Sequence, residues 1–141
     1  MTEKAEVIRD IEEFVSQWQQ GDEAMKRCFC ELFSTVRDIE GVSLSFMARP
    51  GVSFSIRPKH VNQKDRDLFA IIDVIDDEPE ERWLSVCFYG DMITDAEERG
   101  EVIPGGLAGS DGYCFDIDSP DNSTIEYVKL RILEACKNAS L

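Results

Sequence analysis

The hydrophobic residues of the first 40 positions recur every three or four residues, in two successive stripes. The first stripe, within residues 5–19, consists of Val7, Ile8, Ile11, Phe14, Val15 and Trp18. The second consists of Met25, Cys28, Phe29, Leu32, Phe33, Val36 and Ile39. This spacing is typical of amphipathic helices, and Gly21 and Gly41 follow the two stripes as helix ends. The pattern therefore predicts a helical hairpin over about residues 5–40.

After Gly41 the period changes from about 3.6 to two, as expected of strands with one buried face. Residues 42–47 and 52–57 alternate around Pro50-Gly51, which predicts a β-hairpin. Three more strands are predicted at residues 68–75, 83–89 and 113–117. The connections are too short for parallel crossovers, so we expect an antiparallel sheet of about five strands within residues 42–117.

The chain ends in a third helical pattern, predicted over residues 124–139. Ser123 and Glu126 have the spacing of a capping box. A single domain of 141 residues follows, of class α+β, with a single layer of helices on one face of the sheet. This element order resembles several small bacterial proteins of unknown function. The resemblance covers most of the chain as element order only, so it implies no activity and no site residues.

The charge composition excludes some classes of binding partner. The 15 basic and 29 acidic residues give a formal net charge of −14, which opposes binding to nucleic acid or to an anionic membrane. No apolar run reaches the ~20 residues of a membrane helix, and the start of the chain lacks the features of a signal peptide. We therefore expect a cytoplasmic protein.

Metal and cofactor chemistry find little support in the sequence. The chain has five cysteines, an odd number, so we expect reduced, mostly buried thiols rather than a disulfide framework. With a single histidine and no Cys-x-x-Cys motif, the sequence has no zinc-binding signature. Asp116, Asp118 and Asp121 could ligate Mg²⁺ or Ca²⁺, but aspartates before a helix more often cap the turn. We predict no metal and no cofactor.

The sheet face opposite the helices has an unusual composition. Its small hydroxyl and aromatic positions are Ser43, Ser45, Ser53, Ser55, Trp83 and Ser85. A face so poor in Lys and Glu suits a homodimer interface or a shallow ligand groove, because both must lose water. Alternatively, residues 91–112 fold back over it. We expect these residues to form a long ordered loop, for which the functional hypothesis is a mobile lid or a dimer-contact arm. Its glycine-rich part, 104–112, lacks the features of a phosphate loop.

One stretch, residues 49–66, is basic within an acidic chain. Its candidate ligand-binding residues, extended by one tyrosine, are Arg49, Arg57, Lys59, His60 and Tyr89. Such a group could bind the carboxylate or phosphate of a small ligand. The competing interpretation is a solvated hairpin end that offsets the acidic bulk.

The sequence favours a non-catalytic interaction module that binds protein, including a second copy of itself, through the serine- and aromatic-bearing sheet face and the long loop. The alternative is a binding protein or enzyme for a small anionic ligand in the cleft around Arg57 and His60. A third hypothesis, mimicry of nucleic acid by the acidic surface, is weakened by the basic stretch, which interrupts that surface.

Overall fold

A computed structural model describes residues 2–21, 23–107 and 109–141. The helices are α1 (Thr2–Gln17), α2 (Glu23–Arg37) and α3 (Asn122–Ala139), with short 3₁₀ turns η1 (Pro79–Glu81) and η2 (Gly90–Met92). The strands are β1 (Val42–Arg49), β2 (Ser53–His60), β3 (Ile71–Ile75), β4 (Trp83–Phe88), β5 (Glu101–Leu107) and β6 (Ser110–Ile117). The predicted α+β class is confirmed, with six strands rather than about five.

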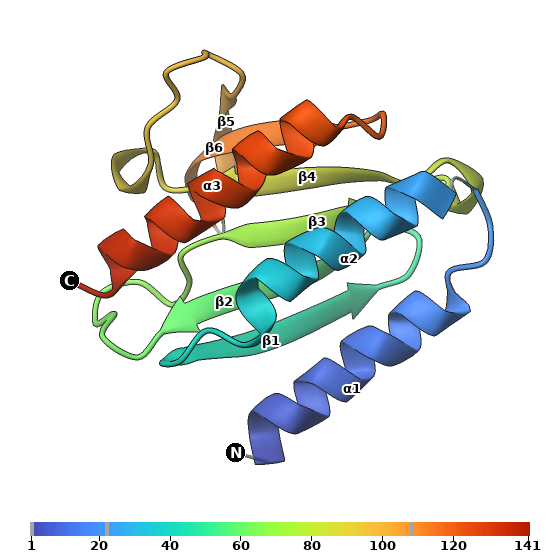
Figure 1. Cartoon of the computed structure of the whole chain (residues 1–141), viewed down its shortest axis with the longest axis horizontal. Helices are drawn as coiled ribbons and strands as arrows, with labels where there is room; N and C mark the ends of the chain where they lie inside the picture. Colours follow the sequence, from blue (N-terminus) through green and yellow to red (C-terminus); the bar gives the residue numbers. More distant parts are fainter. Residues whose placement is uncertain (1, 22, 108) are drawn as a thin grey trace.

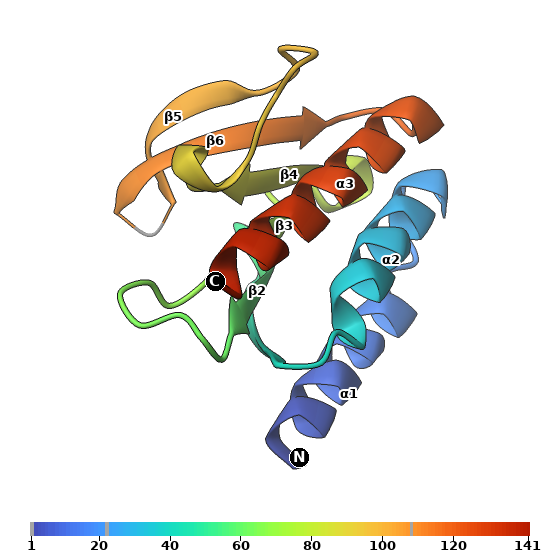
Figure 2. The same cartoon turned by 60° about the vertical axis from the view of Figure 1, so that its left-hand side comes forward.

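The six strands form one open sheet in the order β1-β2-β3-β4-β6-β5, and every neighbouring pair is antiparallel. The three helices lie in one layer on a single face of this sheet (Figures 1 and 2). The main core fills the space between the two layers, where Ile11, Phe29, Ile72 and Ile132 are fully buried. None of the described helices has the length and apolar character needed to cross a membrane.

The predicted ends of the helices and of the first four strands agree with the structure to within a few residues. Two local predictions are wrong, one about the cap of α3 and one about the side chain of Phe69. The side chain that caps α3 is Asp121, which accepts a hydrogen bond from Ser123 N, so the predicted capping box at Ser123 is wrong. Phe69 belongs to the main core, although strict alternation along the predicted strand 68–75 puts it, with Ile71 and Asp73, on the face opposite the helices. The alternation fails there because β3 begins only at Ile71.

The expected long loop over residues 91–112 is wrong in its second half, which forms β5 and the start of β6. These strands make a curved hairpin at one edge of the sheet (Figure 2). The register between them shifts between Ile103 and Leu107, around Pro104 and two glycines. That irregularity hides the two-residue period from which strands are predicted.

The expectation that all thiols are reduced is wrong for one pair. Cys87 of β4 and Cys114 of β6 stand directly opposite each other and form a disulfide. The pairing follows from strand order and register, and the sequence reveals neither. Cys28, Cys30 and Cys136 are not disulfide-bonded, with Cys28 and Cys136 buried and Cys30 partly exposed.

Candidate functional site

The predicted interaction face is only partly open. Ser43 and Ser45 are exposed on β1, and Trp83 and Ser85 are half-buried on β4. Ser53 and Ser55 of β2, by contrast, are 4% and 0% exposed. The available part of this face therefore lies at the β1 side of the sheet.

A second, smaller core covers the other half of the face. Ile71, Cys87 and Cys114 are buried there beneath Leu68 and Leu107. Leu68 comes from the connection before β3, and Leu107 ends β5. Of residues 91–112, which were expected to fold back over this face, Leu107 packs on it, whereas Thr94 and Arg99 contact α3 on the helix side of the sheet.

The candidate ligand-binding residues do not share one face. Arg49, Arg57 and Lys59 lie on the open face of β1 and β2, where Arg49 donates to Ser53 Oγ at 3.1 Å and Lys59 pairs with Asp67 at 3.8 Å. His60 follows on the helix side, beside Gly41, and its Nδ1 accepts a hydrogen bond from Asn62 N. Tyr89 lies beyond β4, where its ring stacks on the guanidinium of Arg66.

An aspartate in the middle of this face was not singled out from the sequence. Asp73 of β3 accepts a hydrogen bond from Ser55 Oγ, and Ser85 stands opposite Asp73 on β4. Burial raises the pKa of the Asp73 carboxyl, while the Ser55 hydrogen bond and the charges of Arg57 and Arg49 oppose that rise. The available signal was an acid within the apolar strand Ile-Ile-Asp-Val-Ile.

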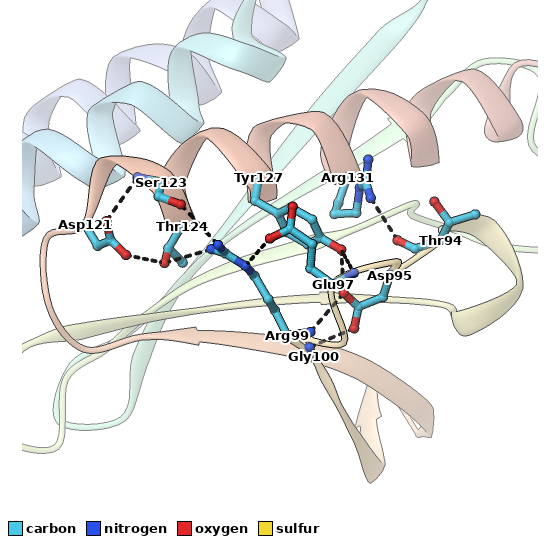
Figure 3. Close-up of polar contacts among 10 residues, drawn as sticks. All are labelled: Thr94, Asp95, Glu97, Arg99, Gly100, Asp121, Ser123, Thr124, Tyr127 and Arg131. Atoms are coloured by element: carbon cyan, nitrogen blue, oxygen red, sulfur yellow. Dashed lines mark hydrogen bonds and ion pairs between the residues drawn. The ribbon is translucent and has the colours of Figure 1, made fainter.

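A second missed cluster joins the connection before β5 to α3 (Figure 3). Asp95 accepts hydrogen bonds from the hydroxyls of Tyr113 and Tyr127, both at 2.6 Å, and from Arg99 N and Gly100 N at 3.0 and 2.9 Å. A side chain at Gly100 would overlap the Tyr113 ring. The glycine therefore lets the tyrosine reach the carboxylate.

The hydrogen bonds of this cluster stabilise Asp95 in its ionised form. Burial works to raise the pKa of Asp95, but the hydrogen bonds from Tyr113, Tyr127 and the two backbone amides hold it well below its usual range. Arg99 completes the cluster by pairing with Glu97 at 2.9 Å and donating to Ser123 and Thr124 of α3. With both Asp95 oxygens occupied twice, we interpret the cluster as a structural tie.

The feature best suited to binding is the free edge of β1. All eight residues of β1 pair with β2 without a bulge. Opposite Leu44, Pro58 accepts a hydrogen bond from Phe69 N on the β3 side. Opposite residues of an antiparallel ladder direct their backbone groups alike, either toward each other or apart. The N–H and C=O groups of Leu44, Phe46 and Ala48 therefore point away from the sheet, and no other described segment pairs with them.

A groove runs along this edge, which we call the edge groove. It has a volume of about 1160 Å³ and lies between α1 and β1, with Val7, Ile8 and Phe46 on its helix side and Ser43 and Ser45 on its open side. Its charged lining consists of Lys4, Arg37, Arg57 and Lys59 against Glu3, Asp38, Glu40 and Asp67. The four positive and four negative charges cancel, although the whole chain carries −14.

No protein-family model, curated protein or solved structure matches this chain. The function is therefore inferred from the residues and their geometry.

Proposed function

We propose that the protein is a non-catalytic, cytoplasmic interaction module that self-associates by pairing β1 with β1 of a second copy. The supporting observation is the edge itself, a regular strand of eight residues in which the outward backbone groups of Leu44, Phe46 and Ala48 lack a partner in the described part of the chain. A row of unpaired N–H and C=O groups is a template on which another strand can add.

A second copy suits this edge for two reasons. A strand is complementary to itself when two copies meet antiparallel about a two-fold axis, which is the common symmetry of homodimers. The cancelled charges of the edge groove also let two chains of net charge −14 approach there without strong local repulsion.

The proposal moves the interface from the predicted sheet face to its margin. Ser43 and Ser45 remain part of it, since their exposed side chains flank the edge, whereas Ser53 and Ser55 are buried. The cytoplasmic location stays a prediction from the sequence, and the Cys87–Cys114 disulfide is a feature more usual in oxidising compartments.

The test replaces one outward-pointing amide. Ala48 is exposed and its N–H points to the free edge, so Ala48→Pro removes an edge donor and leaves the β1–β2 hydrogen bonds intact. We expect light scattering over a concentration series to show a dimer for the wild type and for the control Ala48→Ser, and a monomer for Ala48→Pro. Circular dichroism checks that each variant is folded.

A second variant keeps the test valid if Ala48→Pro fails to fold. Ser45→Lys places like charges on the two adjoining edges without changing the backbone, and it should also yield a monomer. A wild-type protein that stays monomeric throughout the series would refute the proposal.

One observation favours the alternative of a small anionic ligand at Arg57. The Nε atom of Arg57 is buried and has no hydrogen-bond partner among the described residues. If an anion satisfies this group, inorganic phosphate should raise the melting temperature of the wild type but not of Arg57→Gln. An equal rise in both proteins would rule out this site.

A further inference from the structure

We propose that a pocket between α1 and the end of β1 binds an alkylguanidinium or alkylammonium ion. This pocket, called here the aromatic pocket, has a volume of about 480 Å³. It adjoins the edge groove at Phe46, but it is built from side chains on the helix side rather than from the backbone of the edge. The proposal is therefore independent of self-association.

The walls of the pocket are aromatic. Phe14 of α1 stacks on Phe54 of β2 with 4.2 Å between ring centroids, and Phe46 of β1 lies 5.8 Å from Phe14. Ala48 and Pro50 complete the apolar lining. Ring faces of this kind attract cations and accept an alkyl stem equally well.

The rim of the pocket carries unneutralised negative charge. Asp10 and Glu13 line it from α1, and neither carboxylate forms an ion pair within the described residues. The neighbouring Glu12 differs, since it pairs with Arg37 at 3.0 Å. Carboxylates beside aromatic faces supply both kinds of attraction that a guanidinium or ammonium group uses.

The molecule already holds one guanidinium against these rings. Arg82, which also lines the pocket, lies over Phe14, Trp18 and Phe54, with 5.2–5.4 Å from its central carbon to the ring centroids. Its charge is balanced by the buried Asp76, which it contacts at 2.7 Å. In the described part of the chain no cation lies over Phe46, so an incoming cation would use that ring and the carboxylates of Asp10 and Glu13, of which Glu13 accepts only a long hydrogen bond of 3.5 Å, from Gln17 Nε2.

The experiment uses butylguanidinium as the probe and butylurea as its neutral counterpart. A chain of charge −14 attracts any cation, so a matched pair of variants is needed to separate binding in the pocket from general attraction. Glu13→Gln and Glu12→Gln each remove one negative charge at adjacent positions, and only Glu13 lines the pocket. Affinity is measured by amide chemical shifts in a titration of the full chain.

We expect saturable binding of butylguanidinium, with shifts at Gln17, Phe46 and Ala48, and no comparable shifts with butylurea. Glu13→Gln should weaken binding about tenfold, and Glu12→Gln should leave it within about twofold. Phe46→Leu, which keeps an apolar wall but removes the ring, should also weaken it. Equal binding of butylurea, an equal loss in Glu12→Gln, or shifts confined to other surfaces would overturn the proposal.

Discussion

The two edges of the sheet are built in opposite ways. At β1 the edge is regular, eight residues long, free of proline, and charged only at Arg49. At β5 the edge contains Pro104, which lacks an N–H, followed by two glycines and a register shift. Proline and bulges are common means of preventing strand addition.

The edges also differ in how they are held. β5 curls so that Leu107 is buried in the second core, and Asp95 fixes the backbone at Gly100, one residue before the strand. β1 has no comparable tie along its outer side within the described residues. The contrast indicates that the fold closes one edge to strand addition and leaves the other open.

The largest expected effect is a difference in the free energy of unfolding between proline substitutions at inward-pointing and outward-pointing amides of β1. Ser45 lies between outward-pointing residues, so its N–H faces β2 and Ser45→Pro would break the ladder at a cost of about 3 kcal/mol. Ala48→Pro should cost no more than about 1 kcal/mol because its N–H faces outward. Urea denaturation measures both, and equal costs would contradict the assigned direction of the edge.

The next effect concerns the tie of the closed edge. Asp95→Ala leaves two tyrosine hydroxyls and two backbone amides without their acceptor, and we expect a loss of about 2 kcal/mol after allowing for partial exposure. The exposed Asp118→Ala is the control, measured by the same denaturation. If both variants are equally stable, Asp95 does not anchor β5.

A smaller change should appear when the closed edge is opened. Pro104→Val restores an N–H to β5 at an exposed position, with a change in stability below about 1 kcal/mol. We expect larger assemblies in light scattering at high concentration, because the second edge can then pair. Pro120→Val, outside the sheet, is the control, and no difference between the two would mean that curvature alone protects β5.

The smallest expected effect is a change in the ionisation of Tyr113, which is measured by absorbance. The hydrogen bond to Asp95 raises the pKa of Tyr113 from 10.0 to about 12. A raised folded-state pKa stabilises the fold fully below pH 10.0, and this contribution is lost as pH rises through about 12. Tyrosinate absorbance should show this late ionisation, and Asp95→Asn should move the pKa back toward 10.0. An unchanged titration would remove Asp95 as the cause.

The pKa of Asp95 is shifted in the opposite direction, downward, so its effect on stability has the opposite dependence on pH. A depressed folded-state pKa gives stability that is present above the unfolded-state pKa and lost as pH falls through the folded value. Acid should therefore weaken the tie of the closed edge before it changes the backbone pairing at β1.

The sequence predicted the elements whose residues repeat regularly. Both N-terminal helices and the β1–β2 hairpin were found because their apolar residues keep a constant period and Pro50-Gly51 marks the turn. β5 was missed because Pro104, Gly105 and Gly106 interrupt any alternation, which is also what protects that edge.

The sites were harder to predict, since their partners are distant in the chain. Asp95 gathers donors 4, 5, 18 and 32 positions away, so no local motif contains them. His60 and Arg57 are close in sequence, yet alternation along β2 sends their side chains to opposite faces of the sheet. The edge of β1 was not identifiable without the strand order.

The Cys87–Cys114 disulfide closes a covalent ring across a sequence separation of 27. The closed edge, with Asp95 and β5, belongs to that ring, whereas the open edge lies on the linear chain that leads to it. A single protease cut within residues 88–113 would thus leave one covalent molecule. A cut in residues 61–70 would instead leave the segment that carries β1 without a covalent link to the rest of the chain, so that only the β2–β3 pairing and the core would hold the proposed binding edge in place.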